Sequence, residues 1–475
     1  MTEQRVWTSD AAAAATGGRN TVPWAADGVS IDTRTLHKGD LFVALKGPNH
    51  DGHRFIPDAL AAGAAAVVAE RLPEGTPENP PALLVEDTQA ALEALGRAAR
   101  ARSRARVVAV TGSVGKTGTK EVLRQCLAVQ GKTHASVGSL NNHWGVPLSL
   151  ARLPADADYA VFELGMNHPG EITPLARMVR PDVAVITTIA AAHTAFFGSL
   201  DDIAKAKAEI FQGVTPGGAA VLPRDNPYFN RLAEMALNAG VARIVGFGDD
   251  VEADARLLDF SLHARCSAVT AEIKGETYDY CLSLPGAHWV TNSIAVLAAV
   301  AALGADVGKA AGEMAHLRPV AGRGERHDIR LPDGTVEVID DSYNANPASM
   351  RASISVLGQG RQDGGRLIAV LGDMLELGAD SATCHSELLY PLNEAGVDLI
   401  FTCGEEMAAL DAVLPLGIRG GHAATAAELA PAVTEAVRAG DTVLVKGSAG
   451  VKTGRIVQAL LAMDRDDLPK AANGE

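Results

Sequence analysis

The chain has 475 residues, and its 42 basic and 57 acidic side chains give a formal net charge of −15 at pH 7. A negative field of this size opposes general binding to nucleic acid or anionic membranes, because both partners need a positive surface. The hydrophobic fraction of 47% with only 4% aromatic residues is typical of stacked helices and parallel strands rather than of a disordered chain. Because one hydrophobic core seldom organises so long a chain, we expect three domains.

The cysteines and the N-terminus indicate the compartment. The five cysteines lie far apart without a C-x-x-C pair, so we expect reduced thiols, with neither a zinc site nor disulfides. The N-terminus lacks a basic segment followed by an apolar stretch, and no apolar run approaches the roughly 20 residues that span a bilayer. We therefore predict a cytoplasmic protein without membrane insertion.

The first domain is expected over residues 1–104. Short apolar runs at 41–45, 64–68 and 83–85 alternate with alanine-rich helical stretches, and a basic, helix-like segment at 97–106 contains the boundary. This pattern predicts a small α/β domain.

The central domain, expected over residues 105–317, begins with a strand at 107–110, a glycine turn and a helix at 116–128. In such a turn the backbone N–H groups face an anion, a lysine reaches the terminal phosphates, and a threonine hydroxyl holds magnesium. The spacing is shorter than in G-x-x-x-x-G-K-[ST], and the turn alone fits an ATPase, a kinase, a ligase or a plain strand-to-helix connection. The candidate ATP-binding residues are Gly112, Ser113, Val114, Gly115, Lys116, Thr117 and Gly118.

Candidate metal ligands follow the next two predicted strands, at 159–164 and 183–189. Glu163 lies at the end of the first, where a buried carboxylate needs a partner such as magnesium. His193 follows the second strand, at the same edge of the sheet, and Lys207 lies on a helical pattern. By pattern alone these residues also fit a salt-bridged glutamate, a structural histidine and a surface lysine.

The C-terminal domain is expected over residues 318–475, after a loop that begins near residue 317. Helical patterns separate its predicted strands, which favours a second α/β domain of Rossmann-like type. These strands are predicted at 336–339, 367–371, 398–402 and 442–445.

Motifs along most of the chain, in this order, resemble the Mur ligase family. They are Asp32-Thr33-Arg34, Gly39 to Gly47, T-G-S-x-G-K-T, Ser139 to Leu148, Glu163 to Asn167, Leu284 to Asn292, Gly322 to Glu325, Asp340 to Pro347 and Leu371 to Gly378.

The resemblance implies an ATP-dependent ligase of peptidoglycan precursor synthesis. The reaction joins D-alanyl-D-alanine to UDP-N-acetylmuramoyl-tripeptide through an acyl phosphate. The implied fold is α/β, with a small UDP-binding domain, a central P-loop domain with a parallel sheet, and a C-terminal Rossmann-like domain that closes over nucleotide and dipeptide. ATP, two magnesium ions and a monomeric state are expected.

The resemblance also implies roles for individual residues. The catalytic set is Lys116, Lys207, His193 and Arg323. Magnesium ligands, direct or through water, are Thr117, Glu163, His193 and a Lys207 carbamylated by carbon dioxide. Residues around the nucleotide are Asn292, Arg323, Asp341 and Tyr343, with Asp340 close by. Substrate-binding residues are Asp32, Thr33, Arg34, Lys46, Asn141, Asn142 and Asn346.

The chain departs from the family pattern in three places. Gly118 stands where a small hydroxyl residue is common, and Thr194-Ala195 replace Leu-Glu. Ala449 and Gly454 stand where arginine and glutamate are frequent.

Two other functions remain open. One is a sister ligase, including folylpolyglutamate synthase, and the other is a regulatory module that senses ATP. The segments 141–147 and 340–347 favour the dipeptide-adding branch, and retained metal-ligand candidates disfavour a sensor. The sequence does not decide between lysine and diaminopimelate at the third peptide position.

Overall fold

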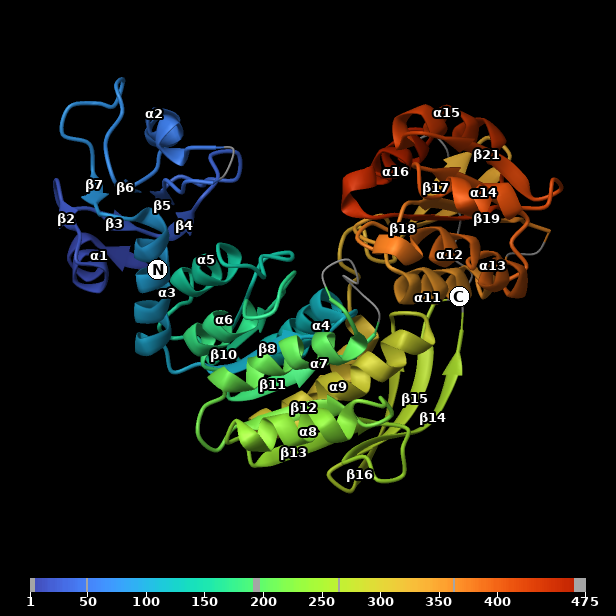
Figure 1. Cartoon of the computed structure of the whole chain (residues 1–475), viewed down its shortest axis with the longest axis horizontal. Coiled ribbons are helices and arrows are strands. Elements are labelled where there is room, and N and C mark those ends of the chain that lie inside the picture. Colours follow the sequence, from blue (N-terminus) through green and yellow to red (C-terminus); the bar gives the residue numbers. More distant parts are fainter. Residues whose placement is uncertain (1–4, 48–49, 191–196, 264, 362–363, 465–475) are drawn as a thin grey trace.

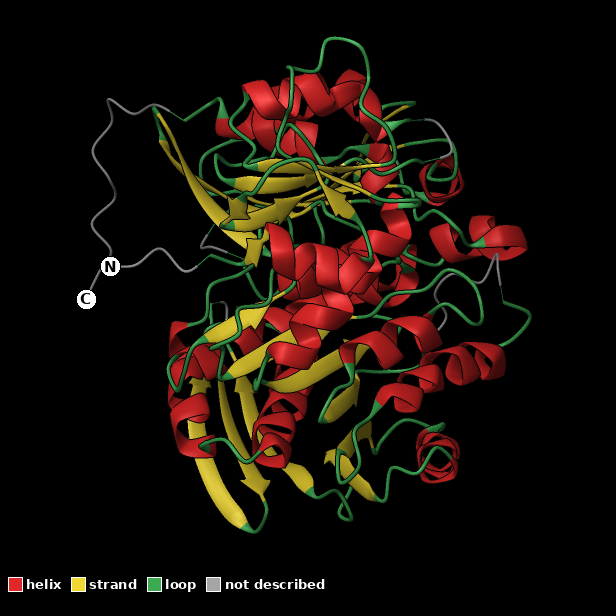
Figure 2. Cartoon of the chain, turned by 90° about the vertical axis from the view of Figure 1, so that its left-hand side faces the viewer, coloured by secondary structure: helices red, strands yellow, loops and turns green. Residues whose placement is uncertain are grey.

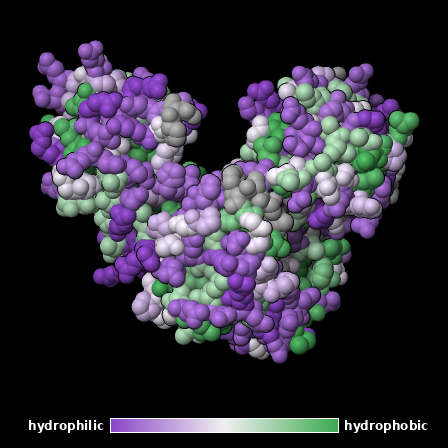
Figure 3. Space-filling view, viewed as in Figure 1, coloured by the Kyte–Doolittle hydropathy of each residue, from purple (hydrophilic) through white to green (hydrophobic). Residues whose placement is uncertain are grey.

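The computed structural model describes residues 5–47, 50–190, 197–263, 265–361 and 364–464. Figure 1 shows the N-terminal domain in blue and the C-terminal domain in orange and red at separate ends of the central domain. Each domain contains its own main sheet, of five, nine and six strands in chain order. The space-filling view shows a wide hollow between the two outer domains (Figure 3). The expected α/β fold of three domains is confirmed.

The N-terminal domain is a small, mostly parallel sheet covered by helices. The strands β4 to β7 are parallel, and β2 is antiparallel to β7. The sheet order is β2 (Arg19–Asn20), β7 (Ala82–Leu84), β6 (Ala66–Ala69), β5 (Asp40–Val43) and β4 (Gly28–Ser30), and β1 (Trp7–Thr8) pairs with β3 (Ala25–Ala26). The helices are α1 (Ser9–Thr16), α2 (Ile56–Ala61) and α3 (Thr88–Arg102), with a 3₁₀ turn at Gly52–Phe55.

The helix α3 joins this domain to the next. Its leucines Leu92 and Leu95 share one buried cluster with Leu148 of the central domain. Ser103 ends α3 in an extended conformation, so residues 103–106 are not helical, in contrast to the prediction for 97–106.

The central domain contains the largest sheet. Its order is β16 (Glu276–Leu282), β15 (Ser267–Ile273), β14 (Ala255–Leu262), β13 (Arg243–Gly248), β12 (Ala219–Pro223), β11 (Val183–Ile186), β8 (Arg106–Thr111), β10 (Tyr159–Glu163) and β9 (Thr133–Ala135). Its helices are α4 (Lys116–Ala128), α5 (Gly145–Ala151), α6 (Ile172–Val179), α7 (Leu200–Ala208), α8 (Phe229–Asn238), α9 (Ala287–Leu303) and α10 (Val307–Glu313), with 3₁₀ turns at Glu209–Gly213 and Met314–His316.

The central sheet was predicted to be parallel throughout, but only part of it is parallel. The strands from β9 to β14 pair in parallel, whereas β14, β15 and β16 form an antiparallel extension. Buried and exposed residues alternate along β15, because one face of an antiparallel sheet can meet water. The parallel strands β8 and β10 are buried on both faces, which explains their unbroken apolar runs.

The C-terminal domain has helices on both faces of a six-stranded sheet. Its order is β17 (Glu325–Leu331), β18 (Gly334–Asp341), β22 (Thr442–Lys446), β19 (Leu367–Gly372), β20 (Leu399–Cys403) and β21 (Arg419–Ala423), with β17 alone antiparallel. Its helices are α11 (Pro347–Gly358), α12 (Ser381–Ser386), α13 (Leu389–Glu394), α14 (Ala408–Val413), α15 (Ala426–Ala436) and α16 (Gly454–Leu461), with 3₁₀ turns at Gly378–Asp380 and Ala449–Val451.

The layered arrangement places the loops at the carboxyl ends of parallel strands near the junction of the domains. Figure 2 shows helices in red on both sides of the yellow strands. In such folds, ligands bind outside the carboxyl ends of the strands. Among the described residues, no helix is long and apolar enough to cross a membrane.

Candidate active site

The glycine turn between β8 and α4 has the geometry of a phosphate-binding loop. Gly115 is the N-cap residue directly before α4 and has φ of 83°, a left-handed conformation that favours glycine. A Cβ at Gly112 would lie 1.9 Å from the hydroxyl oxygen of Thr187, so only glycine fits there. The Nζ atom of Lys116 donates to the Gly112 carbonyl at 2.8 Å. Loss of hydration in this pocket lowers the pKa of Lys116, an effect that the nearby Glu163 carboxylate opposes.

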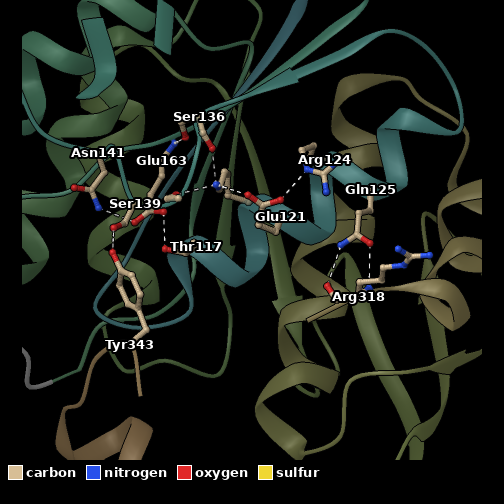
Figure 4. A network of polar contacts seen from close by, with 12 residues as sticks. Thr117, Glu121, Arg124, Gln125, Ser136, Ser139, Asn141, Glu163, Arg318 and Tyr343 are labelled. Atoms are coloured by element: carbon tan, nitrogen blue, oxygen red, sulfur yellow. Dashed lines mark hydrogen bonds and ion pairs between the residues drawn. The ribbon is translucent and has the colours of Figure 1, made fainter. Parts of the chain in front are cut away.

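Glu163 is buried at the end of β10, where two neutral groups hold its carboxylate. The Thr117 hydroxyl donates to Oε2 at 2.6 Å, and the Asn141 amide donates to Oε1 at 2.7 Å. Figure 4 shows these three side chains converging from α4, β10 and the loop after β9. A magnesium ion fits this donor set, because it prefers carboxylate and hydroxyl oxygens beside phosphate oxygens. No cation is bonded to the Glu163 carboxylate among the described residues, so its charge is available to an ion.

A buried lysine fixes the loop that carries Asn141. Lys120 on α4 is fully buried, and its ammonium donates to the carbonyls of Ser136 at 2.6 Å and Gly138 at 2.9 Å. The same ammonium contacts the Glu121 carboxylate at 2.5 Å. These bonds tie the segment after β9 to the helix that begins at the phosphate turn.

Lys207 is a second buried lysine, and its bonding differs from that of Lys120. It lies on α7, is 1% exposed, and forms no hydrogen bond or ion pair with any residue that the structure describes. Burial lowers the pKa of Lys207 well below its ordinary value, and the positive charge of Lys116 adds to this effect. A neutral amine is therefore favoured at this position.

A cavity of about 900 Å³ lies between the central and C-terminal domains. On its C-terminal side, the guanidinium of Arg323 lies 4.1 Å from the ring centroid of Tyr343, and the Tyr343 hydroxyl bonds to Ser139 of the central domain. The buried Lys446 donates to Asp341 at 2.8 Å. Both domains thus contribute charged groups to one chamber.

Most of the predicted residues meet in this cavity. Its lining includes Ser113, Val114, Gly115, Lys116, Thr117, Gly118, Asn141, Glu163, Asn292, Arg323, Asp341, Tyr343 and Asn346. Gly112 contacts the site through its carbonyl. Asn346 also caps α11, because its side chain accepts the Ser349 N–H at 2.9 Å.

Other predicted residues lie elsewhere. Asn142 is outside the cavity lining, and its amide oxygen accepts the N–H groups of Trp144 and Gly145 at the start of α5. In the N-terminal domain Asp32 bonds to Arg34, and Lys46 bonds to Glu70. None of the predicted N-terminal residues, Asp32, Thr33, Arg34 and Lys46, lines this cavity.

The predicted ligand His193 and the departures Thr194 and Ala195 lie outside the described residues. Of the other departures, Ala449 lines the cavity, and Gly454 begins α16 beside Ser342.

The sequence interpretation did not single out Lys120, Ser139, Trp289 or Lys446. Lys120 follows Lys116 by four residues, a spacing that places both on one face of a helix and could have indicated its position. Ser139 and Trp289 lie within motifs that carry the family resemblance, but these motifs alone assign them no role. Their contacts with Tyr343 and Gly118, and that of Lys446 with Asp341, join segments distant in sequence.

Family models match the chain in three consecutive segments. The Mur ligase middle domain matches residues 110–300, the glutamate ligase domain of Mur ligases matches residues 322–449, and the Mur ligase catalytic domain matches residues 26–102.

Similar proteins extend over nearly the whole chain. The UDP-N-acetylmuramoyl-tripeptide--D-alanyl-D-alanine ligases of Escherichia coli and Bacillus subtilis are each 36% identical, over 91% of this chain and 93% of their own length. A crystal structure of MurF from Acinetobacter baumannii matches with a TM-score of 0.82 and 31% identity, over 96% of this chain and 99% of that one. MurF ligase from Thermotoga maritima in complex with ADP matches with a TM-score of 0.75 and 29% identity, over 92% of this chain and 97% of that one.

Proposed function

The chain belongs to the Mur ligase family, and we propose that it joins D-alanyl-D-alanine to UDP-N-acetylmuramoyl-tripeptide with hydrolysis of ATP to ADP and phosphate. The observation that carries the proposal is the meeting of the phosphate turn, the Glu163 carboxylate and the C-terminal cations at one interdomain cavity. The relatives named for this reaction align over more than nine-tenths of their own length.

The first step is phosphorylation of the tripeptide carboxylate. A carboxylate is a poor acyl donor, and at pH 7 it is already ionised, so it attacks the γ-phosphorus of ATP without a base. Two anions must approach each other, and the cationic groups of Lys116 and Arg323 reduce their repulsion. The P–O bond to ADP breaks as the acyl phosphate forms.

The second step forms the amide. The free amine of D-alanyl-D-alanine attacks the acyl carbon and loses a proton, and the tetrahedral intermediate expels phosphate. Water competes at this stage, so a cavity enclosed by two domains suits the chemistry. The Tyr343 to Ser139 bond already connects the two walls.

We propose magnesium as the cofactor and a carbamate on Lys207 as one of its ligands. Thr117 and Glu163 would hold the ion, and magnesium supplies positive charge to the phosphate oxygens when it is bound. Carbon dioxide reacts with neutral amines, and the buried Lys207 amine, which has no partner among the residues that the structure describes, has a lowered pKa. The N–C bond would form with loss of one amine proton to solvent, and the product would be an anionic oxygen ligand in place of the neutral amine. Expected ligation by His193 stays a prediction, as do a second ion, a monomeric state and a cytoplasmic location.

A sister ligase is the competing function. Folylpolyglutamate synthase from Mycobacterium tuberculosis shares the fold, with a TM-score of 0.61 at 18% identity. A likeness at that identity supports the architecture alone, whereas the relatives at 36% identity are named for dipeptide addition. The choice between dipeptide addition and the reaction of a sister ligase is therefore tested by which substrates the enzyme accepts.

The test measures phosphate release from ATP and magnesium with UDP-N-acetylmuramoyl-tripeptide, with and without D-alanyl-D-alanine. Wild type is compared with Lys116→Ala and with Lys132→Ala, a control whose side chain is 45% exposed on the same domain. We expect release that needs both substrates, is lost in Lys116→Ala and persists in Lys132→Ala. Release without dipeptide, or none with lysine- or diaminopimelate-containing tripeptide, would refute the proposed reaction.

A further inference from the structure

The first turns of α4 and α9 meet beside the phosphate turn. A Cβ at Gly118 would lie 2.5 Å from Cη2 and 2.9 Å from Cζ3 of Trp289, and a Cβ at Gly115 would lie 3.2 Å from the amide nitrogen of Asn292. Trp289 and Asn292 are three residues apart on α9, so they share one face of that helix. This face therefore places an indole ring and an amide against the glycines of the turn.

The indole of Trp289 is supported on one side and accessible on another. Trp289 packs against the hydrophobic cluster of the central domain, and it also lines the interdomain cavity. Leu284 and Pro285, which precede α9, add apolar surface to the same cavity. A supported aromatic ring at an aqueous cavity is a suitable surface for a planar ligand.

The course of a nucleotide through the turn brings its base to this surface. The lysine of such a turn reaches the terminal phosphates, and the N–H groups at the helix start hold the inner ones. Gly118 follows Lys116 and Thr117 in the first turn of α4. The inner phosphate, and the sugar and base attached to it, therefore lie on the Gly118 side, where Trp289 is located.

We propose that Trp289 is a nucleotide-binding residue whose indole stacks on the adenine base of ATP, and that Gly118 leaves the space this ring needs. The inference rests on the proposed function, because it takes ATP as the nucleotide. It also accounts for glycine at position 118, since a serine or threonine Cβ there would collide with the ring. Gly118 and Trp289 are thus a matched pair.

The test compares ATP with inorganic tripolyphosphate, which has the phosphates and lacks the base. Calorimetric titration in magnesium gives Kd for both ligands with wild type, Trp289→Phe and Trp289→Ala. Stacking on an aromatic side chain predicts that Trp289→Ala weakens ATP roughly 5- to 150-fold, whereas Trp289→Phe retains most of the affinity. Tripolyphosphate should bind all three within about twofold, because the phosphate contacts are unchanged.

Two results would overturn the inference. Equal weakening of ATP and tripolyphosphate in Trp289→Ala would assign Trp289 to the support of the phosphate turn alone. Unchanged ATP affinity would show that the base lies elsewhere.

Gly118→Ala provides an independent arm. The added Cβ should displace the ring and weaken ATP in the wild-type background, while having no effect on ATP binding in Trp289→Ala. Equal losses in the two backgrounds would contradict the matched pair.

Failure here and failure of the proposed reaction are distinguishable. A wild type that forms the amide while Trp289→Ala binds ATP normally refutes only the stacking. A wild type that binds ATP in a Trp289-dependent manner and forms no amide refutes only the ligase.

Discussion

Substitution of Lys120 by methionine should both destabilise the central domain and disturb the proposed magnesium site at Glu163. The ammonium of Lys120 donates to the carbonyls of Ser136 and Gly138, and methionine removes both hydrogen bonds, the first of them at the buried Ser136. Hydrogen bonds to charged groups contribute about 1.5 kcal/mol or more each, so the expected loss is about 3 kcal/mol. Glu121 keeps its bond to Arg124 at 2.7 Å, so no carboxylate is left unpaired.

The loss has a functional consequence because the two carbonyls belong to the segment that leads to Asn141. With that segment released, the Asn141 amide should orient the Glu163 carboxylate less well. We expect a lower kcat and a higher magnesium concentration for half-maximal activity. Thermal unfolding should shift downward by roughly 6 to 12 °C, at about 2 to 4 °C per kcal/mol for a domain of this size.

Lys132→Met is the matched control. Its ammonium pairs with Asp156 at 2.6 Å at the surface, and such exposed pairs contribute at most about 1 kcal/mol. The expected melting temperature of Lys120→Met is well below that of Lys132→Met. A difference of only about 1 to 2 °C, with the same magnesium concentration for half-maximal activity in both variants, would show that the buried ammonium does not fix the loop.

Two further predictions concern buried titratable groups. Because burial lowers the pKa of Lys207 below 10.5, the unfolded chain binds one more proton between the two pKa values, and stability rises with pH there by at most about 1.4 kcal/mol per unit. In denaturant titrations in carbon-dioxide-free buffer, Lys207→Met should flatten this rise of the unfolding free energy with pH. The variant should also lose ligase activity. An unchanged slope of unfolding free energy against pH would contradict a buried neutral amine at Lys207. Burial likewise lowers the pKa of His134 to about 4, so about 3 kcal/mol of stability should be lost as pH falls from 6.5 to 4. His134→Gln should remove most of this loss in urea titrations at both pH values, and a dependence equal to wild type would assign it to other groups.

Local chemistry made much of the fold and site predictable. The helix predicted at 116–128 coincides with α4 (Lys116–Ala128), because the glycine turn defines its start and its apolar periodicity continues to its end. Glu163 was identified because a carboxylate at the end of a fully apolar strand is costly without a partner. Parallel strands such as β8, β10 and β19 were predicted because burial on both faces removes polar residues from them. The parallel strands β9, β12, β13 and β21 were not predicted. The antiparallel β14 to β16 lack that signature and were missed.

The rest of the site depends on contacts between segments that no local pattern connects. A lysine one turn after a helix start is usually a surface residue, whereas Lys120 is buried and its ammonium donates to the carbonyls of Ser136 and Gly138. In the same way, Gly118 by itself indicates only a departure from the family pattern. The ring of Trp289, 171 positions later in the chain, gives that glycine a physical reason. Gly118→Ala and Trp289→Ala should therefore be tested singly and together, since a change at either residue alters the space available to the other side chain.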